Sequence, residues 1–245
     1  MLAIGNVKLG KLPRVVLAAG GVSSAVAKAV GYGIDLLEFR IDWLKRASPD
    51  IVRRQANAFT RYGLPVIGTV RSRVEGGTAE LSDKQRVALY ECVAPVVDAI
   101  DVEMNATIVK SVATLARSHR AMLILSYHNF TKTPSESVLK GLVKKAETLG
   151  ARIIKLAVHA NCKQDVVRLL AFTVTYRHQN LVTISMGSVG SVSRLLFPLV
   201  GSLMTYTSLS PAHGQIPAKR LIDEMSLYSS RYHEELVRRL ALPKS

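Results

Sequence analysis

The 245-residue chain has few of the residues that mark secreted, metal-binding or membrane-spanning proteins. Its two cysteines, Cys92 and Cys162, form neither a disulfide framework nor a recognisable metal-ligand spacing. No apolar run reaches the ~20 residues that a transmembrane helix requires. Gly, Lys and Pro interrupt the N-terminal stretch too early for a signal peptide. We therefore expect a soluble cytoplasmic protein with no membrane partner.

Acidic residues are also scarce, with 18 Asp and Glu against 33 Lys and Arg and a formal net charge of +15. Such an excess can indicate a nucleic-acid partner. Here the basic residues are spread over segments with helical spacing, such as 51–63 and 231–245, and aromatic residues make up only 6% of the chain. We therefore expect no nucleic-acid partner and favour anionic small molecules as ligands. A basic nucleic-acid-binding protein without catalysis is the alternative from another class.

Short β-rich runs alternate with helical segments along the whole chain. The expected strands are 14–18, 36–40, 65–70, 99–104, 121–127, 152–158, 181–185 and 203–207. This alternation predicts an α/β fold, and eight units in this length predict a closed (β/α)₈ TIM barrel. Residues 2–13 suggest an N-terminal β-hairpin, and without a linker residues 1–245 are expected to form a single catalytic domain. A doubly wound open sheet is the alternative, although "AAGGVSS" lacks the G-x-G-x-x-G spacing.

Strand alternation predicts which side chains point into the barrel, because every second residue faces the same way. In "LLEFRID", Glu38 and Arg40 share one face, while the other face is apolar and suits packing against helices. Asp101 and Glu103 are more typical of supporting groups than of catalysts. The same parity brings polar residues to the C-terminal ends of strands, where barrels carry their reactive groups: Thr69, Arg71, Asp101, Glu103, Ser126, His128 and Lys155.

Lys155 stands in the middle of the apolar stretch "ARIIKLAV". An ammonium group is costly to bury unless it is paired or used in its uncharged form. Burial and like charge would favour the free amine of a lysine that is ringed by Arg40, Arg71 and His128. Such an amine is a nucleophile towards a ketone and forms a Schiff base. His128, one strand away, is placed to move protons beside it.

Each of these residues also has a structural alternative. Glu38 and Arg40 are compatible with an ion pair at the barrel mouth. Lys155 is compatible with a counter-ion for Glu38 or Glu103. His128 alone is more typical of a hydrogen-bonded structural histidine. The remaining histidines are scattered without metal-ligand spacing, so no metal is expected. The convergence of ionisable groups from six strands on one rim favours a catalytic site.

Seven motifs occur in an order that is similar to a known family. They are "LEFRIDWL" (37–44), "TVRSRVEGG" (69–77), "DVEM" (101–104), "SYHNF" (126–130), "IIKLAV" (153–158), "ISMGSVGSVSRL" (184–195) and "GQIP" (214–217). With them the chain resembles the type I 3-dehydroquinate dehydratases, the Schiff-base enzymes of the shikimate pathway. The resemblance implies a lyase that converts 3-dehydroquinate to 3-dehydroshikimate, the third step of aromatic amino-acid biosynthesis. It implies no metal or organic cofactor, and homodimers are common in the family.

The resemblance also implies a role for individual residues. Lys155 would be the Schiff-base lysine, His128 the general acid and base, and Glu75 the group that orients His128. Arg194 and Gln215 would hold the substrate carboxylate, which a guanidinium can grip bidentately. The remaining substrate-binding residues would be Glu38, Arg40 and Arg71, which meet the ring hydroxyls, and Met186, which packs against the ring.

One loop departs from the pattern of the family. Alignment on Gln215 places Pro211, which has no hydroxyl, at the position of the family's serine. Ser208 and Ser210 are the candidate replacements, and His213 is an additional side chain near the substrate.

The alternative among Schiff-base barrels is a class I aldolase that acts on a phosphorylated sugar. In that hypothesis Gly187, Ser188 and Gly190 would cradle a phosphate at a helix N-terminus. Arg194 and Gln215 favour a carboxylate instead.

Overall fold

The computed structural model describes residues 2–209 and 214–241. Over these residues, eight parallel strands form one sheet in the order β10-β3-β4-β5-β6-β7-β8-β9. Each strand agrees with its expected range to within two residues. The strands are β3 (Arg14–Ala19), β4 (Leu36–Arg40), β5 (Val66–Thr69), β6 (Ala99–Glu103), β7 (Met122–Asn129), β8 (Ile153–His159), β9 (Leu181–Met186) and β10 (Met204–Ser208).

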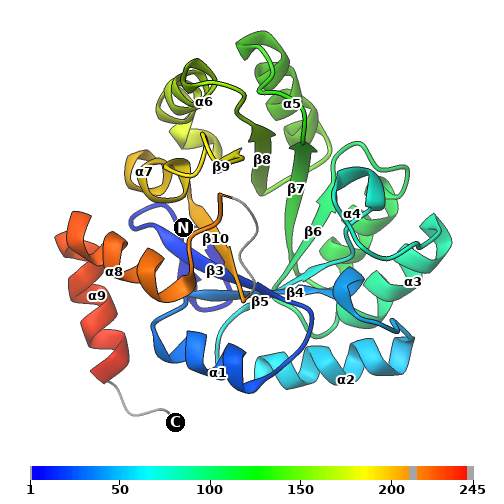
Figure 1. Ribbon diagram of the computed structural model, residues 1–245. Helices are drawn as coiled ribbons and strands as arrows, with labels where there is room; N and C mark the ends of the chain where they lie inside the picture. The colour runs from blue at the N-terminus through cyan, green and yellow to red at the C-terminus, as the bar shows by residue number, and fades with distance from the viewer. Residues whose placement is uncertain (1, 210–213, 242–245) are drawn as a thin grey trace.

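A helix follows each of these strands and packs on the outside of the sheet (Figure 1). These helices are α1 (Ser24–Gly31), α2 (Pro49–Thr60), α3 (Asp83–Val93), α4 (Val109–Ser118), α5 (Glu136–Thr148), α6 (Lys163–Thr175), α7 (Ser193–Val200) and α8 (Ala218–Tyr228). Three short 3₁₀ turns accompany them: η1 (Ile41–Trp43), η2 (Arg73–Glu75) and η3 (Arg177–Gln179). The predicted (β/α)₈ barrel is confirmed, and the doubly wound open sheet is wrong because strands consecutive in sequence are neighbours around a ring.

The predicted N-terminal hairpin is also confirmed. Strands β1 (Ala3–Ile4) and β2 (Val7–Lys8) pair in antiparallel register. Ile4 and Leu9 are buried in the same apolar cluster as Leu36 of the barrel interior. The hairpin therefore closes the end of the barrel at which the strands begin.

The barrel wall separates two apolar layers, as the alternation of residues predicts. Leu37, Phe39 and Ile41 belong to the layer between sheet and helices. Leu36 and Ile67 belong to the layer inside the barrel. The inward positions nearer the C-terminal ends of the strands are polar, and they form the site described below.

Within the described residues, the ring of strands lacks a regular parallel ladder between β9 and β10. β9 and β10 are the two ends of the hydrogen-bonded ladder. They are linked just below β10, where Leu203 N donates to the Leu181 carbonyl at 2.8 Å. Thr183 N also donates to Ser202 Oγ at 3.0 Å. We call this junction between β9 and β10 the seam.

A further helix, α9 (Ser230–Ala241), follows the eighth unit and overlaps the segment 231–245 that the sequence predicts as helical. It buries Tyr232 and Leu236 against the barrel. Arg239 Nη1 lies 2.8 Å from Asp35 Oδ1, which also accepts from Arg14 Nη1 at 3.1 Å. Burial raises the pKa of Asp35, and the two arginines oppose that rise.

None of the helices in the described parts of the chain is both long and apolar enough to span a bilayer.

Candidate active site

A cavity of about 430 Å³ opens at the C-terminal ends of the strands. This is the end of a barrel at which reactive groups gather. The sequence-predicted site residues all line it: Glu38, Arg40, Arg71, Glu75, His128, Lys155, Met186, Arg194 and Gln215. The residues that parity and motif order predicted come from strands β4, β7, β8 and β9 and from the segments that follow β5, β9 and β10.

Lys155 extends from the middle of β8 to the base of this cavity and is only 4% exposed. Its Nζ lies 3.0 Å from Asp101 Oδ2 and 3.5 Å from Glu38 Oε1. On another side, Nζ lies 4.0 Å from the ring centroid of Tyr206. The expectation that basic residues ring this lysine is thus wrong for its closest charged neighbours, which are carboxylates. Of the predicted counter-ions, Glu38 is present.

Arg71 was expected beside Lys155, but its guanidinium is bound by other groups. It donates to Asp101 Oδ1 at 2.8 Å and to Ser126 Oγ at 2.7 Å, and it lies 3.2 Å from Glu103 Oε1. Burial disfavours the charge on Arg71, but Asp101 and Glu103 hold its pKa above the ordinary value. Parity fixes the face on which a side chain lies, and these contacts decide where its charged end goes.

Asp101 lies closer to the buried lysine than its expected supporting role suggests. Burial opposes its ionisation, but Arg71 and Lys155 hold the pKa of Asp101 well below its usual range. The group is therefore a carboxylate that contacts Lys155 directly. Glu103 fits the expected supporting role, since it accepts from Ser72 N at 2.8 Å and pairs with Arg86 of α3.

His128, near the end of β7, is joined to Glu75 of the loop after β5. Glu75 Oε2 accepts from His128 N at 2.8 Å and lies 3.0 Å from His128 Nδ1. Burial lowers the pKa of His128 well below its ordinary value, and Arg71 and Lys155 lower it further, so the imidazole is neutral at pH 7. Burial also raises the pKa of Glu75 to about 7.

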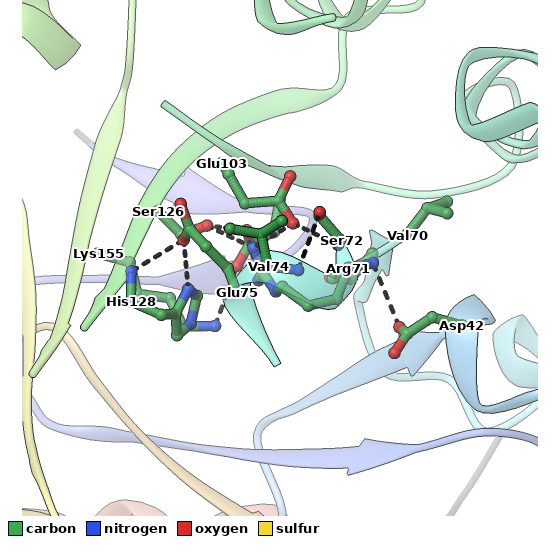
Figure 2. Close-up of polar contacts among 12 residues, drawn as sticks. Asp42, Val70, Arg71, Ser72, Val74, Glu75, Glu103, Ser126, His128 and Lys155 are labelled. Carbon is green, nitrogen blue, oxygen red and sulfur yellow. Dashed lines mark hydrogen bonds and ion pairs between the residues drawn. The ribbon is translucent and has the colours of Figure 1, made fainter. Parts of the chain in front are cut away.

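Asp42 is a functional candidate that the sequence analysis missed. Its carboxylate is buried and accepts from Arg71 N and Thr78 N, each at 3.3 Å. The Asp42 carbonyl accepts from Thr78 Oγ1 at 2.5 Å. Asp42 thereby ties down both ends of the 71–78 segment that carries Glu75. Figure 2 shows Lys155 and His128 at one end of this polar network and Asp42 at the other.

Arg40 is also held by Asp42. Its Nε and Nη2 donate to the two carboxylate oxygens of Asp42 at 2.9 and 2.7 Å. Its guanidinium stacks 4.3 Å from the centre of the Trp43 ring. The alternative of an ion pair between Glu38 and Arg40 is therefore wrong, and Glu38 accepts instead from Thr69 Oγ1 at 2.9 Å. The signal for Asp42 was available, because residues 38, 40 and 42 share one parity.

Arg194, at the start of α7, brings a positive charge to the seam side of the cavity. It is 7% exposed, and its Nη1 donates to the Tyr206 carbonyl at 3.2 Å. Within the described residues its Nε has no hydrogen-bond partner, and no carboxylate pairs with its guanidinium. Burial lowers the pKa of Arg194 to about 10, so the group stays charged at pH 7. A buried cation of this kind is suited to an anionic ligand.

The loop after β10 is described in part. Gln215 lines the cavity, and its Oε1 accepts from Ser208 Oγ at 2.8 Å. Ser208 thus contacts a predicted substrate-binding residue, and its role as a replacement for the family's serine stays a prediction. Ser210, Pro211 and His213 lie outside the described residues.

Sequence reasoning also missed four aromatic or imidazole side chains of the cavity wall, Trp43, Phe130, His159 and Tyr206. A histidine or tyrosine at a strand position carries no signal by itself. His159 shares the parity of Lys155, which would have placed it on the inner face.

The phosphate cradle of the aldolase hypothesis is only partly present, since Gly187 lines the cavity in the described structure and Ser188 and Gly190 do not. A Cβ at Gly190 would lie 2.4 Å from the Ser185 carbonyl oxygen, so close backbone packing explains this glycine. In the described parts of the chain, no group of His, Cys, Asp and Glu side chains is arranged to hold a metal ion.

The barrel and its cavity define an α/β-barrel enzyme with a buried lysine at the base of its site. The model of the family "Type I 3-dehydroquinase" matches residues 18–231, and the chain belongs to this family.

Relatives and solved structures agree with this assignment. The chain is 35% identical over 192 residues to a 3-dehydroquinate dehydratase of Thermodesulfovibrio yellowstonii, covering 78% of this chain and 84% of the relative. It is 34% identical over 221 residues to the enzyme of that name from Methanocella arvoryzae, covering 89% and 98%. The crystal structure of the Aquifex aeolicus 3-dehydroquinate dehydratase superposes with a TM-score of 0.78 at 32% identity, covering 89% of this chain and 99% of that one.

Proposed function

We propose that this protein dehydrates 3-dehydroquinate to 3-dehydroshikimate through a Schiff base on Lys155. One observation carries the proposal: a single cavity holds the buried Lys155, the neutral His128 and the unpaired cation of Arg194. These are a nucleophile, a proton acceptor and an anchor for a carboxylate. The names of the curated relatives support the same reaction.

The first step forms the covalent intermediate. The neutral imidazole of His128 takes a proton from the Lys155 ammonium and later returns it to the departing ketone oxygen. The free amine adds to the ketone carbon of the substrate. Loss of the ketone oxygen as water then leaves a protonated imine. The iminium withdraws electrons from the neighbouring carbon and makes its C–H bond acidic. No metal or organic cofactor is required, because the iminium is the electron sink.

His128 performs the proton transfers that follow. Because its imidazole is neutral, it can take the proton from the carbon beside the iminium. The resulting imidazolium returns that proton to the departing hydroxyl, which leaves as water. Hydrolysis of the imine releases the product and restores the amine. A hydrogen on Nδ1 that points to Glu75 leaves Nε2 with the lone pair for these steps.

The remaining residues hold the substrate in this proposal. Arg194 and Gln215 take the carboxylate at the seam side, and Met186 packs against the ring. Glu38, Arg40 and Arg71 meet the ring hydroxyls. Of these three, Arg40 is best positioned to bind a hydroxyl, because Asp42 fixes its guanidinium at the cavity wall.

We further propose a single catalytic domain that works in the cytoplasm, where its two free cysteines stay reduced. A homodimer is the assembly proposed, on the basis of the family resemblance.

Borohydride trapping tests the covalent mechanism. The protein is incubated with 3-dehydroquinate and borohydride, its intact mass is measured, and the modified peptide is mapped. A ligand-sized adduct on Lys155, together with enone absorbance in the untreated reaction, is the expected result. A folded protein that gives neither would refute the proposal.

A further inference from the structure

Tyr206 lies directly against the reacting atom of the proposed mechanism. It sits on β10 at an inward position, between Met204 and Ser208, and is 5% exposed. The centre of its ring is 4.0 Å from Lys155 Nζ. Ala18, on the paired strand β3, and Ala157, on β8, line the same cavity with small side chains.

The hydroxyl of Tyr206 does not account for this placement. Within the described residues it is buried without a hydrogen-bond partner. Burial raises the pKa of Tyr206 well above its ordinary value, and the carboxylates of Glu38 and Asp101 raise it further. The phenol therefore stays protonated and is unsuited to take up protons from the substrate. What the residue offers Lys155 is the face of its ring, whose negative quadrupole attracts a cation.

The ring and the carboxylates hold the lysine in different ways. Asp101 contacts Nζ through a hydrogen bond, which needs an N–H that points at it. Condensation with a ketone replaces two N–H bonds of the ammonium by the C=N bond and releases the ketone oxygen as water. The nitrogen keeps its positive charge but has one N–H left. An attraction between charge and ring face does not depend on the direction of that N–H, so it persists through the step.

We propose that Tyr206 is a further catalytic residue, whose ring face stabilises the positive charge at Lys155 Nζ as the ammonium becomes an iminium. This assignment rests on the proposed Schiff-base function. The charged and titratable groups that surround the nitrogen from the other strands and loops are Asp101, Glu38, Arg71 and His128. The carboxylates balance the charge of the lysine in the free enzyme, and the ring keeps the imine protonated once hydrogen-bond donors have been lost.

Stepwise fluorination of the ring tests this role. Tyr206→Phe is the reference, and 4-fluoro-, 3,5-difluoro- and 3,4,5-trifluorophenylalanine then replace it at the same position. Each fluorine weakens the negative face of the ring while its shape changes little. We expect kcat to fall at every step, by an overall factor on the order of 5 to 30. The alkaline limb of the kcat–pH profile should move to lower pH, since a less stabilised iminium loses its proton more readily.

The matched control places trifluorophenylalanine at Phe172 of α6, which packs against Tyr176 just after that helix and does not line the cavity. That variant should keep the parent kcat and pH profile.

Each outcome separates the two proposals. Equal kcat values and pH profiles across the series would overturn the role of the ring, and an inactive but folded Tyr206→Phe variant would overturn it in favour of the hydroxyl. If the parent protein forms a borohydride adduct on Lys155 while the series is flat, the assignment of Tyr206 fails alone. If the parent forms no adduct, the Schiff-base function fails and the assignment falls with it.

Discussion

Glu75 and His128 are joined at two points through one oxygen atom, because Glu75 Oε2 accepts from the main-chain N of His128 and also lies beside its Nδ1, at 2.8 and 3.0 Å. This double contact fixes both the strand position and the ring of His128. A loop carboxylate thus sets the direction in which the imidazole presents its free nitrogen to the cavity.

The raised pKa of Glu75, about 7, predicts a pH dependence. Below pH 7 the protonated Glu75 supports an imidazolium poorly, so kcat should rise as pH increases through 7. Glu75→Gln should lower kcat and remove this acid limb. Measuring the kcat–pH profiles of the parent and the variant tests this prediction. An unchanged acid limb in the variant would mean that a group other than Glu75 causes it.

The same shift predicts an effect on stability with the opposite sign. Between the ordinary value of 4.5 and about 7, the folded protein holds a proton on Glu75 that the unfolded chain has lost. This group therefore lowers the free energy of unfolding as pH rises through that window. Glu75→Gln should flatten that part of the profile, measured by urea titration at several pH values. A slope equal to that of the parent would contradict the assignment.

Lys155→Met should abolish turnover, because the thioether cannot form an imine. The barrel should stay folded, since Met is close to Lys in length and Arg71 still pairs with Asp101. Enone absorbance measures turnover, and circular dichroism checks the fold. Lys140, exposed on α5, is the matched control, and Lys140→Met should keep the parent rate. Substantial activity in Lys155→Met would rule out the Schiff base.

Arg194→Ala should act mainly on substrate binding. Hydrogen bonds to charged groups are worth about 1.5–3 kcal/mol each, so KM should rise roughly 10- to 100-fold with a smaller loss in kcat. Arg194→Lys keeps the charge without the planar guanidinium, so its KM should lie between those of the parent and of Arg194→Ala. Steady-state kinetics with 3-dehydroquinate gives both constants. An unaltered KM would remove Arg194 from the carboxylate site.

Asp42→Asn should loosen the segment that carries Glu75 together with the guanidinium of Arg40. We expect the free energy of unfolding to fall by about 1–3 kcal/mol, with a higher KM and a lower kcat. The control is Asp50→Asn in the exposed first turn of α2, which should change neither quantity. If both variants behave alike, Asp42 is not a positioning residue.

Arg239→Ala should destabilise the packing of α9 without changing catalysis. Among the residues that the structure describes, the substitution leaves the buried Asp35 with Arg14 as its one ionic partner. The free energy of unfolding should therefore fall by about 1–3 kcal/mol. The neighbouring Arg238 is 76% exposed in its pair with Glu234, and Arg238→Ala should have little effect. Thermal unfolding compares the two, and equal melting temperatures would contradict the role of Arg239.

The sequence predicted the barrel well because each strand is a short apolar run with clear limits. Strict alternation then placed residues such as Glu38, His128 and Lys155 on the inner face. Alternation does not say at which height a long side chain ends or which partner it meets. For this reason Glu38 was foreseen as a counter-ion of Lys155, but Asp101, its nearest carboxylate, was not. Tyr206 was missed because one tyrosine in a β-rich run looks like ordinary strand composition.

The residues that line the cavity stand on two groups of strands, which differ in how the strands are hydrogen-bonded to one another. Lys155, His128, Asp101 and Glu38 stand on the uninterrupted ladder from β4 to β8. Met186, Arg194, Tyr206 and Gln215 come from the two strands that meet at the seam or from the segments that follow them. The recognition residues Met186, Arg194 and Gln215 can thus be exchanged while Tyr206 is kept, and the segments after β9 and β10 can be lengthened or shortened. Neither change alters the pairing register of the strands that carry Lys155 and His128. For directed evolution of new carboxylate substrates, the seam is the side of the barrel to randomise.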